Sequence, residues 1–130
     1  MHVPNFRTNV MYDRATDLLY EVYCDTEKLD QSHAMPLRKY ALYIVRKITS
    51  AIIEHNKKKK CKLLNEVKGQ IVALRDESYE LYQVGLIDGY MIDDIAEQLL
   101  KLINYQFKKN AERNLTFRIF TGVIIHMPIF

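Results

Sequence analysis

The chain has 130 residues, of which 48% are hydrophobic, so it is long enough to enclose one hydrophobic core and we expect a single folded domain. Only four glycines are present and 27% of the residues are charged, which argues against a disordered chain and against a turn-rich β architecture. The net charge of +3 is mildly basic and excludes no class of partner by itself.

The start of the chain gives no sign of export. Residues 1–8 lack a basic region followed by an apolar one, so they do not resemble a secretory signal, and we expect an N-terminal arm there. No stretch approaches the roughly 18 apolar residues that a membrane span requires. Cys24 and Cys61 lack the number and spacing of a disulfide framework, and we expect both to be small buried residues. These features predict a cytoplasmic protein with no membrane contact.

The first half of the chain predicts two helices. The first runs from Asn9 to about Lys28, because its apolar residues recur at spacings of three and four. The stretch DQSHAMP interrupts this pattern, and Pro36 fits the first turn of a second helix, which we expect from about Met35 to the lysine run. We expect the four consecutive lysines, residues 57–60, to form a loop at the carboxyl end of that helix, where cations are favoured by the helix dipole.

The second half predicts two more helices and a tail. Residues 64–81 show the clearest periodicity, with alternating spacings of three and four that are typical of left-handed helix packing. We expect Gly85 to end this helix and Asp88 to cap the fourth, which runs to about Arg113 with acidic residues first and basic residues last, as its dipole favours. Residues 114–130 are rich in β-branched and aromatic side chains and predict a short extended tail.

Four amphipathic helices with short connections predict antiparallel neighbours. The expected fold is therefore all-α, an up-down-up-down antiparallel four-helix bundle formed by residues 9–113. The N-terminal arm (1–8) and the C-terminal extended tail (114–130) lie outside this bundle.

Motifs of enzymes are absent from the sequence. It contains no HExxH, GxSxG, phosphate-binding loop or dinucleotide-binding glycine pattern. His55 lies near Cys61, but two ligands do not make a zinc site. Asp93, Asp94 and Glu97 fit the solvated first turn of a helix, and the ExxH pattern of bundle metal sites is missing. We therefore expect no enzyme activity, no catalytic residue, no metal and no cofactor.

Charge is strongly segregated along the chain. Residues 9–30 hold two basic and six acidic side chains, a net charge of −4, whereas residues 35–62 hold nine basic and one acidic, a net charge of +8. Lys39 and Arg46 are seven positions apart and share a helix face, and the lysine run continues that stripe. A basic stripe of this kind is the electrostatic footprint of proteins that bind the phosphate backbone of RNA or DNA. The candidate contacts are Arg38, Lys39, Arg46, Lys47, Lys57, Lys58, Lys59, Lys60, Lys62 and Arg75.

Two other interpretations of this charge pattern stay open. The lysine run can simply keep a loop solvated. Alternatively, the acidic first helix can meet the basic second helix of a neighbouring subunit, which makes the segregation a device for self-assembly or for protein interaction. Aromatic residues such as Tyr40, Tyr43, Tyr79 and Tyr82 could stack on bases, but at helical spacing they are more typical of half-buried packing.

The sequence also resembles a known family. The run LLNEVKGQIVALRDESYELYQVGLIDGYMIDDIAEQLLKLI (63–103), preceded by LRKYALYIVRKITSAIIE (37–54), is similar to the four-helix bundles of the accessory variability determinant (Avd) of diversity-generating retroelements and of the proteins encoded in 23S rRNA intervening sequences. The likeness covers about Tyr12 to Lys108. It is carried by the heptad-like spacing, by the pair Leu74 and Arg75, and by Asp88 and Tyr90 at the start of the fourth helix.

The resemblance implies a non-catalytic accessory protein. Members of the family form a homopentameric barrel whose basic surface binds nucleic acid and a reverse transcriptase, and they assist mutagenic reverse transcription of a template RNA. Arg75 matches a basic position of the family's third helix, whereas the next turn, residues 78–80, is less basic than the family pattern. That departure moves the expected contact to residues 35–62, and the segment after Arg113 matches nothing in the family.

Overall fold

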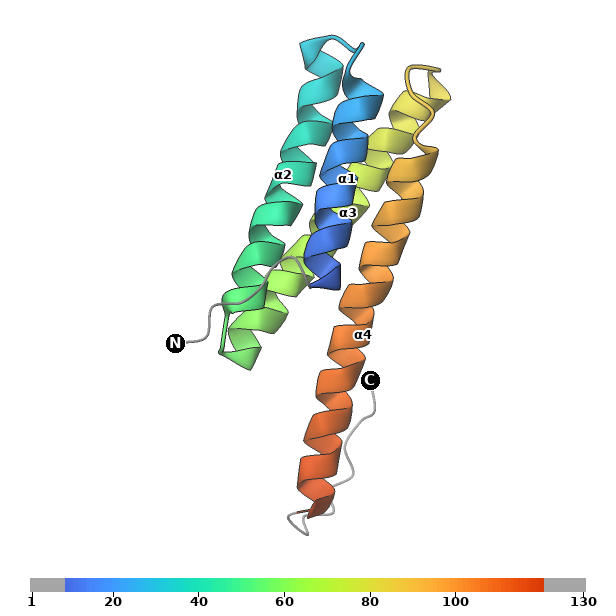
Figure 1. Cartoon of the computed structure of the whole chain (residues 1–130). Coiled ribbons are helices and arrows are strands. Elements are labelled where there is room, and N and C mark those ends of the chain that lie inside the picture. The colour runs from blue at the N-terminus through green and yellow to red at the C-terminus, as the bar shows by residue number, and fades with distance from the viewer. Residues whose placement is uncertain (1–8, 121–130) are drawn as a thin grey trace.

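The computed structural model describes residues 9–120, and the side chains of residues 9–109. It contains four helices, α1 (Val10–Thr26), α2 (Gln31–Ile53), α3 (Lys57–Gln83) and α4 (Tyr90–Phe120), and no strand occurs between residues 9 and 120. Successive helices run in opposite directions and pack on their neighbours in the chain, and α4 closes the bundle against α1 (Figure 1). The predicted up-down-up-down four-helix bundle is confirmed.

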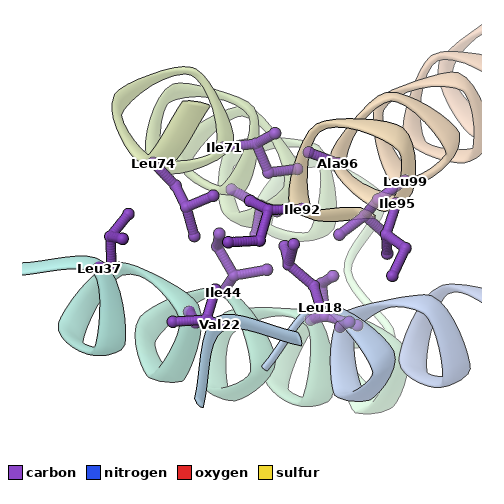
Figure 2. Packing of buried hydrophobic residues seen from close by; sticks show 14 of the residues in the cluster. Leu18, Val22, Leu37, Ile44, Ile71, Leu74, Ile92, Ile95, Ala96 and Leu99 are labelled. Atoms are coloured by element: carbon purple, nitrogen blue, oxygen red, sulfur yellow. The ribbon is translucent and has the colours of Figure 1, made fainter. Parts of the chain in front are cut away.

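One core runs through the bundle and draws on all four helices. Figure 2 shows Leu18 and Val22 of α1, Ile44 of α2, Ile71 of α3 and Leu99 of α4 pointing into the same space, and each of these side chains is fully buried. Burial of one such side chain stabilises the fold by about 1.5–3 kcal/mol. The core positions of α2 and α3 fall at the three-and-four spacing expected from the sequence.

The start of α2 differs from the sequence expectation. The helix begins at Gln31, and the Asp30 carboxylate accepts hydrogen bonds from the Ser32 hydroxyl and the His33 ring. Pro36 therefore lies in the second turn and not in the first. Because proline has no N–H, the helix loses one hydrogen bond there, the one to the carbonyl oxygen of the exposed Ser32. The predicted start at about Met35 was wrong by four residues, because the helix already begins at Gln31, where the Asp30 carbonyl accepts the first helical hydrogen bond, from the Ala34 N–H at 3.0 Å.

The lysine run is helical, contrary to the expected loop. The connection between α2 and α3 consists of residues 54–56 only, and Lys57 to Lys60 form the first turn of α3. Asn56 is the N-cap residue, and its side-chain oxygen accepts a hydrogen bond of 3.1 Å from the Lys59 N–H. The cap places the lysines at the amino end of a helix instead of the carboxyl end.

The turn between α3 and α4 depends on two glycines. Gly85 has a φ of 78°, and the hydrogen bonds Leu86 N–H to Leu81 O (2.9 Å) and Gly85 N–H to Tyr82 O (3.0 Å) close a Schellman motif. Gly89, with a φ of 72°, precedes the first residue of α4, and its N–H donates to the Asp25 carboxylate at 3.2 Å. Gly85 ends the helix as predicted, whereas the position before α4 belongs to Gly89 and not to Asp88.

α4 is longer than expected and extends past the other three helices (Figure 1). It continues to Phe120, so residues 114–120, expected in an extended tail, are helical. No glycine or proline lies between Gly89 and Gly122, so no residue of this stretch interrupts the helix. The rest of the predicted tail and the predicted arm (1–8) fall outside the described residues.

Some side chains are more exposed than expected. Cys24 is exposed and Cys61 is half-buried, so neither is the buried residue that we predicted. Tyr40 is half-buried against the core as expected, whereas Tyr79 and Tyr82 are 58% and 53% exposed. Between residues 9 and 120, no helix combines the length and apolar character needed to cross a membrane.

Candidate nucleic-acid interface

The first turn of α3 gathers four positive charges around free backbone donors. The side chains of Lys57, Lys58 and Lys59 are exposed, and Lys60 is half-buried. Asn56 donates its N–H to the Glu54 carboxylate at 3.1 Å and caps Lys59 with its own side chain. The N–H groups of Lys57 and Lys58 have no partner within the helix, as is usual at a helix start. This turn therefore presents ammonium groups and backbone donors together, which suits an anion.

An ion pair shows which levels of α2 and α3 lie side by side. Lys47 Nζ lies 3.3 Å from Glu66 Oε2 and 5.3 Å from the centre of the Tyr43 ring. The Glu66 carboxylate beside the ammonium group raises the pKa of Lys47 and so favours its charged form. Because the helices are antiparallel, a residue that follows Lys47 in α2 lies at the level of a residue that precedes Glu66 in α3 by the same number of positions.

That register places bases of both helices on one surface. Lys62 precedes Glu66 by four residues, and Lys58 precedes Lys62 by four, so all three share one side of α3. Arg46 is exposed and lies roughly 8 Å along the bundle axis from Lys62. We call Arg46, Lys47, Lys58, Lys59 and Lys62 the basic face. In the described part of the molecule, only Lys47 among these five has an acidic partner.

The basic face continues around the end of the bundle. Lys57 and Lys60 line a hollow of about 320 Å³ together with His55. Its other walls come from α1, α2 and α4 and include Met11, Ile52 and Gln106. The lysines at the start of α3 thus border both the α2–α3 side of the bundle and its end.

Three predicted contacts lie away from the basic face. Arg38 donates to the Thr26 hydroxyl (3.0 Å) and backbone oxygen (3.4 Å), and its guanidinium lies 4.5 Å from the centre of the Tyr23 ring. It therefore holds the end of α1 against α2. Arg75 donates to the Asp93 carboxylate at 2.8 Å and so joins α3 to α4. Lys39 is exposed on the same stripe of α2 as Arg46, but lies roughly 24 Å along the axis from the level of Lys58.

The charges of α3 oppose its own dipole. Residues 57–68 contain six lysines and one glutamate, whereas residues 72–83 contain Arg75 and three acids, Asp76, Glu77 and Glu80. A helix favours acids at its start and bases at its end, by about 0.3–1 kcal/mol for each charge at low ionic strength. α4 follows this rule, with Asp93 in its first turn. The lysines of α3 are therefore not explained by helix stability.

Sequence reasoning missed one group of residues. Tyr79, Tyr82 and Tyr90 are all exposed and line one hollow at the opposite end of α3, where the periodicity alone assigned the first two to packing. The available signal was the charge around them, because residues 71–97 hold one basic and seven acidic side chains.

Known proteins offer no guide to this surface. Comparisons with protein-family models, with curated proteins and with solved structures give no match to this chain. Among the described side chains, no three His, Cys, Asp or Glu residues come together in an arrangement that could hold a metal ion. The functional interpretation therefore depends on the fold and the charges.

Proposed function

We propose that this protein is a non-catalytic accessory protein whose basic face binds the phosphate backbone of RNA or DNA. The observation that supports the proposal is the first turn of α3, where the positive charges of Lys57 to Lys60 lie at the positive end of the helix dipole. Bound phosphate would relieve both the unfavourable charge–dipole interaction and the repulsion among neighbouring ammonium groups. Solvation of a loop gives no comparable reason, because these lysines are in a helix.

The chemistry of the basic face suggests how it would bind. Lysine ammonium groups supply charge without reading base edges, so binding would be largely independent of sequence and sensitive to salt. Arg46 is the one guanidinium of the basic face, and it could form a bidentate contact with a single phosphate. Arg38 and Arg75 are engaged with Thr26 and Asp93, and we assign them to the fold rather than to the ligand.

The resemblance to the Avd family extends the proposal. It suggests a cytoplasmic homo-oligomer, pentameric in that family, that assists a reverse transcriptase while contributing no catalytic residue. The confirmed four-helix bundle agrees with that architecture.

Self-assembly without a nucleic-acid role is the alternative. The observation that favours it is the charge of α1 and its flanks, a net −4 over residues 9–30, which could meet the basic face of a second copy. Sedimentation velocity over a salt series separates the two. An oligomer that dissociates as salt rises supports charge-driven assembly, whereas an oligomer that resists salt while its nucleic-acid complex dissociates supports the adaptor.

The experiment that tests the proposal compares two variants with equal charge loss. Fluorescence anisotropy of labelled single-stranded and duplex RNA and DNA is measured over a salt series with the wild type, with K58Q/K59Q/K62Q, and with K28Q/K39Q/K101Q. The first triple variant removes lysines of the basic face, and the second removes exposed lysines elsewhere.

If the three lysines of the basic face each contact a phosphate, the slope of log K against log salt on duplex DNA should fall by about 2.7 units in the first variant. In the second variant the slope should differ from that of the wild type by no more than about 0.9 units, the value for one phosphate contact. Equal losses in both variants would mean that net charge alone attracts the nucleic acid, and absence of binding by the wild type at low salt would remove the proposal.

A further inference from the structure

The opposite end of α3 carries an aromatic hollow of about 250 Å³, bordered by the last turns of α3 and the start of α4. Its rings come from Tyr79, Tyr82 and Tyr90, which are 58%, 53% and 69% exposed. The rings of Tyr79 and Tyr82 lie with centroids 6.2 Å apart and planes tilted by 30°. Three exposed tyrosines around one concavity are typical of a recognition site, because aromatic side chains are enriched where proteins bind partners.

The aromatic hollow is kept open by a glycine. Gly89 also lines it, and a Cβ at this position would lie 3.0 Å from the Ser78 hydroxyl oxygen. The φ of 72° at Gly89 disfavours any other residue there. A side chain at position 89 would therefore both strain the backbone and fill the space beside Ser78.

Ser78 provides an unused polar group in this space. The residue as a whole is 5% exposed, and its hydroxyl makes no hydrogen bond among the described residues. Other helical hydroxyls of the bundle donate to the carbonyl four residues back, as Thr26 does to Val22 at 2.6 Å and Thr49 to Val45 at 2.8 Å. Because Ser78 lines the aromatic hollow, its hydroxyl can accept a hydrogen bond from a ligand that enters it.

The charge around the aromatic hollow is negative. Its charged lining residues are Asp88, Asp93 and Arg75. Arg75 and Asp93 pair with each other, whereas Asp88 has no ion pair in the part of the chain that the structure describes and leaves the lining with a net negative charge. The acids of the last α3 turns, Glu77 and Glu80 among them, add to this field at the negative end of the helix dipole. Such a field repels phosphate and attracts cations.

We propose that the aromatic hollow binds an arginine side chain of a partner polypeptide. A guanidinium can stack on a tyrosine face, pair with the Asp88 carboxylate and donate to the Ser78 hydroxyl at the same time. Lysine, a compact and strongly hydrated ammonium, matches planar rings and a carboxylate less well. The same pairing already occurs inside this molecule, where the Arg38 guanidinium lies over the Tyr23 ring.

The test uses three short blocked peptides, Ac-Gly-Arg-Gly-NH2, Ac-Gly-Lys-Gly-NH2 and Ac-Gly-citrulline-Gly-NH2, titrated into the ¹⁵N-labelled full chain. Backbone amide shifts should change at residues 78–82 and 88–90, the arginine peptide should bind more tightly than the lysine peptide, and the citrulline peptide, which is neutral and similar in shape, should not bind. Shifts spread evenly over the acidic surface, or equal shifts from the citrulline peptide, would overturn the proposal.

Matched variants locate the site. D88N and Y82A should each weaken binding of the arginine peptide by about fivefold or more, whereas D76N and Y105A, an exposed acid and an exposed tyrosine outside the aromatic hollow, should leave it unchanged. Equal weakening by D88N and D76N would overturn the proposal. A dilution series of the labelled protein tests a second copy as the occupant, and concentration-dependent shifts at the same amides without peptide would also overturn it.

Discussion

The two ends of α3 carry opposite charges, and both oppose the dipole of the helix. The amino end presents Lys57 to Lys60 beside free backbone donors, and the carboxyl half presents Asp76, Glu77 and Glu80. Between them runs one uninterrupted core stripe, from Leu64 to Leu81. The contrast teaches that the core residues of this helix stabilise the fold, whereas the charges at its two ends do not, and for this reason we propose a partner of opposite charge at each end.

A change in the shared core should affect both ends together. Ile71 is fully buried midway along α3, and I71A should lower the free energy of unfolding by about 2–5 kcal/mol, because it removes apolar contacts and leaves a cavity. Urea denaturation followed by circular dichroism measures this loss. A loss below about 1 kcal/mol would mean that the two ends of α3 are not held by one tightly packed core.

Arg38 should affect stability and not binding, and its exposed neighbour Lys39 should affect neither. R38A should lower the free energy of unfolding by about 1–2 kcal/mol, since it removes hydrogen bonds to Thr26 and the contact with the Tyr23 ring. The neighbouring K39A, which removes an exposed charge, should change stability by less than about 0.5 kcal/mol. If R38A instead weakened nucleic-acid binding at unchanged stability, Arg38 would belong to the interface.

Two glycines should respond in opposite directions. Gly69 lies mid-helix, midway between the two ends of α3, and a Cβ there meets nothing within 4 Å, so G69A should raise the free energy of unfolding by about 1 kcal/mol. G89A should lower it, because of the positive φ and the contact with Ser78. Thermal melts of both variants check the signs. A stabilising G89A would contradict the description of the aromatic hollow.

The lysine end should gain stability when its charge is removed. K58Q should raise the free energy of unfolding by about 0.3–1 kcal/mol at low ionic strength, because a cation leaves the positive end of the dipole, while binding to nucleic acid weakens. Urea titrations at low and at high salt measure the gain, which should shrink as salt screens the charges. A destabilised K58Q would show that this lysine supports the fold.

Sequence alone predicted the bundle because its core repeats regularly. Positions such as Ile44, Ile71 and Leu99 follow a spacing that only a helix satisfies, so the fold class and most core residues were accessible. The first residue of each helix was harder to predict from the sequence. Asn56 caps α3 without an acid at Lys59 to complete a capping box, and a run of lysines resembles a loop when no cap is recognised.

The candidate site was only partly predictable, because long-range pairing is invisible in a single sequence. Arg75 and Asp93 are 18 positions apart, and Arg38 and Thr26 are 12 apart, so nothing local distinguished these arginines from free ones. The basic face consists of Arg46, Lys47 and three lysines of α3, which share a surface because α2 and α3 pack side by side.

The most direct measurement of the central claim is lysine footprinting. The protein is treated with an acetylating reagent with and without a saturating RNA, and modification of each lysine is quantified by mass spectrometry after cleavage at glutamate. If the lysine end of α3 contacts phosphate, Lys58, Lys59 and Lys62 should be protected, and Lys28, Lys39 and Lys101 should react equally in both samples. Equal reaction at all six lysines, with the RNA bound, would contradict the account.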